Sequence, residues 1–132
     1  VEYGEIDING FVLPYSPEHT LVAGIESRML DGLALRLDYK YVSKVYSDFL
    51  NLEVSNPLGI SGPIPGYGIL NLSANYDITS KIKVSLVGKN LMDLKYIGSR
   101  LHSSPYQAEA GLSSGIIPGA RRQINFSLEY LF

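Results

Sequence analysis

The chain has 132 residues and a formal net charge of −2, which suits one ordinary domain and provides no general electrostatic basis for binding nucleic acid. Cysteine is absent, so disulfides and thiolate metal sites are excluded. No stretch approaches the roughly 18–20 apolar residues of a transmembrane helix, and the first residues lack the basic start and apolar run of a signal peptide. We therefore expect either a soluble protein or a piece of a longer one whose amino-terminal part is missing.

The first part of the chain predicts an irregular start followed by a hairpin. In residues 1–19, Gly and Pro interrupt short apolar groups. Residues 20–30 and 33–46 alternate apolar and polar side chains, which is the period of two of a strand with one apolar face and one polar, or wet, face. Between them, Asp31-Gly32 predicts a two-residue turn with positive φ at both positions. The wet face of this hairpin would carry Glu26, Arg28, Arg36, Asp38, Lys40 and Lys44.

Three further strands are expected, at residues 67–76, 81–89 and 120–132. They are separated by a long irregular loop at 47–66, a short turn at 77–80 and a second long irregular stretch from about 90 to 119. On the fourth strand Lys83 joins the wet face, where Val87 is an apolar exception. The prediction is thus all-β: an antiparallel up-and-down meander of about five long strands, joined by short and long connections in turn.

The last strand shows the clearest separation of faces. One face would hold Ile124, Phe126, Leu128, Tyr130 and Phe132, and the other Gln123, Asn125, Ser127 and Glu129. A soluble protein seldom ends on a long apolar strand, because an unpaired edge invites aggregation. In a membrane barrel the pattern is ordinary, with the apolar side toward lipid and the polar side toward the lumen.

The alternation of connection lengths supports the same interpretation. Both short turns would lie at one end of the sheet and both long loops at the other, as in bacterial outer-membrane barrels. Each strand has about the 9–11 residues that a tilted strand needs to cross a bilayer. Aromatic residues then fall near both boundaries: Tyr76, Tyr130 and Phe132 at the periplasmic one, Tyr41 and Tyr67 toward the outer one. The alternative is a soluble, half-buried antiparallel sheet, although the long loops look poor in apolar residues that would cap its core.

Several stretches resemble the carboxy-terminal barrel of TonB-dependent outer-membrane receptors. Lys89-Asn90-Leu91-Met92-Asp93-Leu94-Lys95-Tyr96 is similar to the family's Asn-Leu-Phe-Asp-x-x-Tyr motif, with Met92 where Phe is usual. Further similar stretches are Ser16–Leu21, Ile64–Tyr67 with Leu70–Tyr76, Pro118–Arg122 and Leu128–Phe132. Each is weak alone, but their order and spacing match from Pro14 onward.

This resemblance implies a segment of a barrel that closes with about 22 strands around a plug. Residues 1–132 would be the carboxy-terminal portion, with the plug and the remaining strands absent. The implied function is TonB-dependent uptake of a nutrient across the outer membrane, an iron chelate such as a ferric siderophore by default, and cobalamin or a sugar otherwise. The implied partners are outer-membrane lipid and lipopolysaccharide, the TonB complex through the missing amino-terminal part and its TonB box, and the barrel-assembly machinery. A porin-like barrel and a small soluble sheet protein that binds an apolar ligand are the alternatives.

Candidate site residues follow from the same resemblance. Arg, Tyr and His in outer loops suit an anionic iron chelate, because guanidinium pairs bidentately with carboxylate. The candidates are Arg100, His102, Tyr106 and Arg121 for the ligand, and Phe126, Leu128, Tyr130 and Phe132 for the assembly signal. By alternation, Arg121 faces the lumen and Arg122 faces outward, toward lipopolysaccharide phosphates. We expect Asn90–Asp93 to be architectural. The isolated histidines and the lack of a catalytic constellation predict no enzyme, no metal site and no cofactor.

Overall fold

The computed structural model describes residues 7–101 and 115–132. Within these ranges every regular element is a strand, and no helix is long and apolar enough to cross a membrane. The strands are β1 (Thr20–Leu30), β2 (Leu33–Val42), β3 (Val45–Tyr46), β4 (Pro63–Ile64), β5 (Tyr67–Asp77), β6 (Ile82–Lys89), β7 (Ile97–Leu101), β8 (Gly115–Pro118) and β9 (Gln123–Tyr130).

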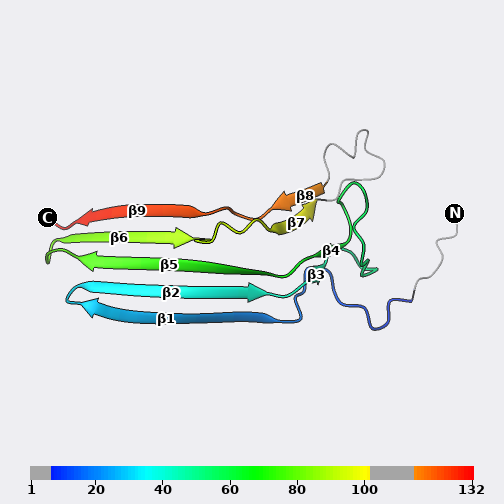
Figure 1. Ribbon diagram of the computed structural model, residues 1–132, viewed down its shortest axis with the longest axis horizontal. Coiled ribbons are helices and arrows are strands. Elements are labelled where there is room, and N and C mark those ends of the chain that lie inside the picture. The colour runs from blue at the N-terminus through cyan, green and yellow to red at the C-terminus, as the bar shows by residue number, and fades with distance from the viewer. Residues whose placement is uncertain (1–6, 102–114) are drawn as a thin grey trace. The chain divides into compact units, whose positions relative to one another are not determined.

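Five long strands form one antiparallel sheet in the order β1-β2-β5-β6-β9, side by side in Figure 1. This confirms the predicted all-β meander, and the bounds of β1 are those expected from the sequence. The last strand pairs with β6, from Ile82 opposite Tyr130 to Lys89 opposite Gln123. Among the described residues, β1 and β9 each keep one unpaired edge, so the sheet stays open.

The β1–β2 turn differs in detail from the prediction. Gly32 has a positive φ of 82°, but Asp31 does not, and the pairing shifts between Arg28 and Leu30. A glycine in the left-handed region beside a bulge is the usual alternative to a two-residue turn with two positive φ angles. Glycine is also the only residue that fits at position 32, because a Cβ there would lie 2.8 Å from the carbonyl oxygen of Asp77.

The register places the predicted faces on two continuous surfaces. Residues directly opposite each other in an antiparallel pair project from the same side. One row therefore runs Ile25, Leu37, Leu72, Gly88 and Ile124, which is apolar from edge to edge. The next row runs Glu26, Arg36, Ser73, Val87 and Asn125, and it is mostly polar. We call these surfaces the apolar face and the polar face.

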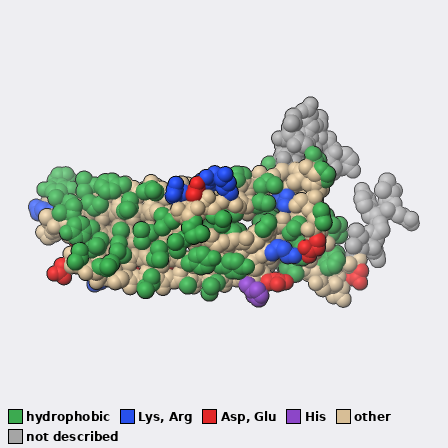
Figure 2. All heavy atoms as spheres, viewed as in Figure 1, with side chains coloured by type: hydrophobic (Ala, Val, Ile, Leu, Met, Phe, Trp, Pro, Cys, Tyr) green, Lys and Arg blue, Asp and Glu red, His purple; other side chains and the backbone are tan. Residues whose placement is uncertain are grey.

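The apolar face is open to its surroundings. Ile25 and Phe126 are 68% and 69% exposed, and Figure 2 shows hydrophobic side chains spread along the strands. In the part of the chain that the structure describes, the only buried hydrophobic side chains are Val45 and Ile64, which lie outside this sheet. A soluble, half-buried sheet would cover one face with a core. Here the side chains of the apolar face are exposed among the described residues, as they are in the wall of a membrane barrel.

The chain divides into two compact units. The sheet unit comprises His19–Val42, Tyr67–Tyr96 and Gly119–Phe132, and holds the five long strands. The loop unit comprises the described parts of 1–18, 43–66 and 97–118, and holds two small sheets, β3–β4 and β7–β8. The prediction that 47–66 and about 90–119 are irregular throughout was therefore wrong.

The second predicted strand also ends earlier than expected, at Val42 instead of residue 46. Val45 and Ile64 pair directly across β3–β4 and are 9% and 3% exposed, so burial of these two side chains favours a small separate sheet over a continuation of β2. Lys44 consequently does not belong to the polar face, contrary to the prediction. The long connections thus contain a small core of their own.

Candidate functional site

The predicted ligand residues fall in different parts of the molecule. Arg100 lies on β7 in the loop unit, and Arg121 lies just before β9 in the sheet unit. His102 and Tyr106 lie outside the described residues. The structure thus describes two of the four candidates, and each is the centre of a polar cluster.

Arg100 is buried, with 5% of its surface exposed. Its Nη1 donates to the Gly59 carbonyl at 2.6 Å, and its Nη2 donates to Ser55 Oγ and to the Pro63 carbonyl, both at 2.8 Å. No carboxylate forms a salt bridge with Arg100 in the described ranges, and its Nε has no hydrogen-bond partner there. Oxygens of the 55–63 segment therefore stabilise this buried charge, and in return Arg100 fastens that segment to β7.

The start of the described chain is tied to the same cluster. The Tyr15 hydroxyl donates to the Arg100 carbonyl at 3.1 Å and accepts from the Arg100 amide at 3.2 Å. Asn51 makes a reciprocal pair with Val12, accepting from its amide at 2.6 Å and donating to its carbonyl at 2.8 Å. Three chain segments of the loop unit are therefore joined by polar side chains as well as by its small core.

The surface of the loop unit carries a second charged group at Lys44. Its ammonium contacts Glu53 and the Tyr46 hydroxyl, and it lies 4.6 Å from the centre of the Tyr46 ring. Hydrogen bonds from Tyr46 and from Lys44 lower the pKa of Glu53. This cluster is solvent-exposed, so it contributes less to stability than the buried Arg100.

Asn90 is the corresponding anchor of the sheet unit, with 3% of its surface exposed. It follows β6 directly and adopts a positive φ of 49°, which Asn tolerates better than most residues. Its Nδ2 donates to the carbonyls of Leu94 and Ala120, and its Oδ1 accepts from the Leu94 amide, each at 2.9 Å. Asn90 thereby joins the end of β6 to the segment that enters β9, the architectural role expected from the sequence.

Asp93 completes this anchor from the same motif. Its carboxylate accepts two hydrogen bonds from Arg121, one of them from Nε at 2.8 Å, and one from the Arg122 amide at 3.0 Å. The Arg121 side-chain bonds, followed by the Arg122 amide bond, hold the pKa of Asp93 well below its ordinary value of 3.8. The carboxylate therefore stays ionised at any physiological pH and neutralises Arg121.

An aromatic pair reinforces the same end of the sheet. The rings of Tyr67 and Tyr96 stack with centroids 4.3 Å apart. A Cβ on Gly119 would lie 2.1 Å from the Tyr96 ring, so glycine is required there for the ring to lie against the backbone. Tyr67 begins β5 at the long-connection end of the sheet, and it pairs with Val42 in the polar-face register, so it belongs to that face.

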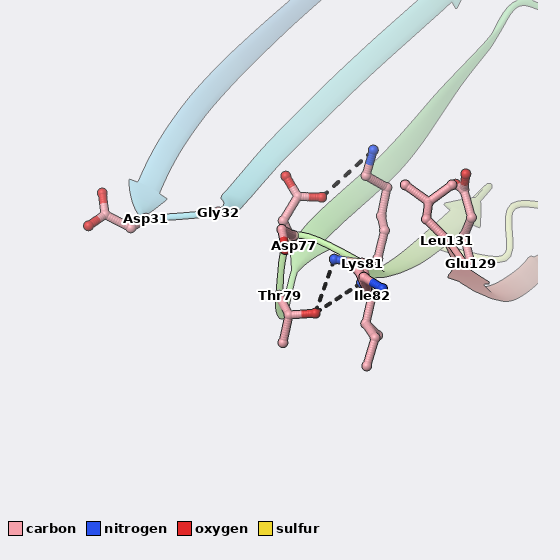
Figure 3. A pocket seen from close by; sticks show the side chains of 10 residues that line it. Asp31, Gly32, Asp77, Thr79, Lys81, Ile82, Glu129 and Leu131 are labelled. Carbon is pink, nitrogen blue, oxygen red and sulfur yellow. Dashed lines mark hydrogen bonds and ion pairs between the residues drawn. The ribbon is translucent and has the colours of Figure 1, made fainter.

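At the opposite end of the sheet unit, the short turns enclose a hollow of about 510 Å³ (Figure 3). Its lining carries both charges, and Asp77 pairs with Lys83 at 3.7 Å. The Thr79 hydroxyl caps the turn by accepting from the amides of Lys81 and Ile82. The hollow is open, and its lining mixes charged side chains with the apolar Ile82 and Leu131 and holds no cluster of catalytic type.

The predicted assembly-signal residues share one surface. Phe126, Leu128 and Tyr130 lie on the apolar face of β9 and are all exposed. Phe132 follows the strand, and its ring packs edge-on against Tyr130 with centroids 5.1 Å apart. The described ranges contain no group of three or more His, Asp or Glu that would hold a metal ion. The fold, with its exposed apolar face and its long connections at one end, is that of a wall segment from a large transmembrane β-barrel.

Comparison with known proteins gives the family. The model of the family described as TonB dependent receptor-like, beta-barrel, matches residues 2–91. The chain belongs to this family. Its members are receptors and not enzymes, in agreement with the prediction from the sequence. No curated protein matches the chain.

Solved structures show the same fold. The ferric citrate transporter FecA in its unliganded form is 21% identical, with a TM-score of 0.71 over 87% of this chain and 16% of its own. The siderophore receptor PiuA from Acinetobacter baumannii is 20% identical, with a TM-score of 0.71 over 93% of this chain and 15% of its own. The ferric yersiniabactin uptake receptor FyuA from Yersinia pestis is 19% identical, with a TM-score of 0.60 over 89% of this chain and 16% of its own. The chain therefore spans about one sixth of the length of these receptors.

Proposed function

We propose that the chain is the carboxy-terminal wall of an outer-membrane receptor for TonB-dependent uptake of an iron chelate, most simply a ferric siderophore. The observation that carries this proposal is the open sheet with an uncovered apolar face on one side and a polar face on the other. The family match and the ferric citrate, siderophore and ferric yersiniabactin receptors among the structural relatives support the choice of substrate class.

The two faces and the two ends of the sheet then have different partners. The apolar face contacts outer-membrane lipid, and the polar face lines the lumen. The hollow at the short-turn end, with its mixed charges, faces the periplasm, where a plug and TonB box supplied by the rest of the receptor connect to the TonB complex. The row Phe126, Leu128, Tyr130 and Phe132 is the segment that the barrel-assembly machinery recognises.

The loop unit is placed at the extracellular end in this proposal. It would present residues for ligand capture, among which Arg100, His102 and Tyr106 remain predictions, as does Arg121 at the adjoining end of the sheet. Because the Arg100 guanidinium is occupied by loop oxygens, its most direct contribution to capture is to hold the surrounding segments in place.

The test is uptake of labelled iron by cells that carry or lack the full-length receptor, on a panel of ferric citrate and several ferric siderophores. We expect deletion to abolish uptake of one member of the panel, and the same loss when TonB is removed from cells that keep the receptor. Uptake that continues without TonB would favour a porin-like barrel. If cells that lack the receptor use every iron source normally but fail to take up cobalamin or a sugar, TonB-dependent uptake remains the function and an iron chelate is the wrong substrate.

A further inference from the structure

The connection between β3 and β4 (Figure 1) presents large apolar side chains to its surroundings. Within residues 49–58, which we call the apolar segment, Val54 is 80% exposed and Phe49 is 65% exposed. The leucines of the same segment are exposed as well, namely Leu50, Leu52 and Leu58. Single exposed hydrophobic residues are ordinary, but a concentration of them in one loop indicates a surface that binds something apolar.

Polar side chains hold the backbone of this connection in place. Asp48 Oδ1 accepts hydrogen bonds from the amides of Leu50 and Leu52, at 3.1 and 3.2 Å. Its Oδ2 accepts from the Gly62 amide at 3.2 Å. Arg100 fastens the rest of the connection through its three hydrogen bonds to the 55–63 segment. The apolar segment is therefore fixed in shape while its hydrophobic side chains stay outside, and a surface prepared in this way loses little conformational entropy when it binds.

The charges of the loop unit indicate which kind of ligand suits this segment. Lys44 is paired with Glu53, and Arg100 is buried against loop oxygens. Among the described residues of the unit, no cation is therefore free to meet an anionic ligand. These residues also contain four acidic side chains against two basic ones, the acids being Asp7, Glu18, Asp48 and Glu53 and the bases Lys44 and Arg100. The acidic surplus disfavours a polyanionic ligand and favours one that is neutral or cationic.

We propose that the apolar segment binds a hydrocarbon substituent of the transported chelate, such as an acyl chain. The chelate is then an amphiphile whose iron-binding head carries no surplus of negative charge, unlike ferric citrate. A stretch of about ten residues is shorter than one side of a standard protein interface, roughly 20–30 residues, so it suits a small ligand better than a protein. This inference rests on the proposed function, which makes an iron chelate the substrate and places the loop unit at the extracellular end.

The test measures binding of radiolabelled iron chelates to the full-length receptor in nanodiscs. The probes are the ferric complexes of N-acetyl- and N-decanoyl-desferrioxamine B, which share an uncharged head and differ only in the length of the acyl chain. We expect the parent receptor to bind the decanoyl probe at least about tenfold more tightly, because burial of a few methylene groups contributes that much. Val54→Ser should weaken binding of the decanoyl probe about tenfold and leave the acetyl probe unaffected. Ile78→Ser, which removes an exposed apolar side chain from the turn between β5 and β6, is the matched control and should bind both probes as the parent does.

Equal binding of the two probes by the parent, or equal weakening in Val54→Ser and Ile78→Ser, would overturn the site. Tighter binding of ferric citrate than of the decanoyl probe would overturn the inferred charge of the ligand. A labelling experiment tests whether another part of the receptor covers the segment instead. Val54→Cys should react with a water-soluble maleimide in the unliganded receptor, and the decanoyl probe should protect it. A cysteine that fails to react without the probe would show that the segment is already covered, and would overturn the proposal.

The proposed function is judged by separate results. TonB-dependent uptake of a chelate without any effect of the acyl chain would leave iron uptake standing and remove only the apolar site. Chain-dependent binding by a receptor that takes up no iron would leave the binding surface standing and count against the proposed function.

Discussion

Replacement of Asn90 by alanine will loosen the segment that enters β9, with a local cost of about 3 kcal/mol. The substitution removes three side-chain hydrogen bonds at a site that is 3% exposed, and it places alanine at a φ of 49°, where L residues other than Asn and Asp are strained. Hydrogen exchange of the Leu94 amide, which donates to Asn90 Oδ1, should accelerate about 100-fold in the full-length receptor.

Two companion variants separate the contributions at this position. Asn90→Gly also loses the hydrogen bonds but relieves the backbone strain, so it should cost about 1 kcal/mol less than Asn90→Ala. Asn75→Ala removes an exposed Asn on the polar face that contacts Ser85, and it should leave the exchange of Leu94 unchanged. Unaltered exchange in Asn90→Ala would show that the anchor does not stabilise this segment.

Replacement of Arg100 by alanine will have an effect of similar or greater size in the loop unit, about 3–5 kcal/mol. The guanidinium makes three hydrogen bonds to the 55–63 segment from a buried position, and truncation leaves those oxygens without their charged donor. Amides of residues 55–63 should exchange at least 100-fold faster. Under the proposed function, ligand affinity should also fall, because the segments proposed to present the ligand residues are no longer held together.

The matched controls for Arg100 come from the same unit. Lys44→Ala removes an exposed cation paired with Glu53 and should change the exchange of residues 55–63 little. Arg100→Lys keeps the charge but loses the planar fork, so it should recover part of the protection. If Arg100→Ala lowers ligand affinity while exchange stays at the parent rate, the guanidinium meets the ligand directly and the structural role is wrong.

The long strands were predictable because each extends over many residues in which apolar and polar side chains mostly alternate with a period of two. Alternation in β1 and β9 continues for at least eight residues, so the faces and the pairing of β9 with β6 followed from the sequence. The two-residue strands β3 and β4 are too short to show any period. Their pairing depends on the burial of Val45 against Ile64, a contact between distant parts of the chain that no local pattern reveals.

The polar anchors Asn90, Asp93 and Arg100 were predictable only where a local sequence motif marks them. Asn90 and Asp93 stand in a recognisable motif at the end of a strand, so an architectural role was the natural expectation. Arg100 was expected to contact a ligand because arginine in an outer loop suits an anionic iron chelate. Its partners are carbonyls and a hydroxyl, groups that every segment carries, so the sequence contains nothing that marks it as buried. The role of Tyr15 was missed for the same reason.

The central claim is that the apolar face meets lipid and the polar face meets the lumen. It is tested most directly by spin labels introduced singly along β9 in the full-length receptor reconstituted in lipid vesicles, since this chain contains no cysteine of its own. Collision rates with oxygen, which concentrates in lipid, and with a water-soluble nickel chelate report the environment of each label. We predict an alternation of period two, with oxygen access high at 124, 126 and 128 and low at 123, 125, 127 and 129. A profile without alternation, or one with the opposite phase, would contradict the account.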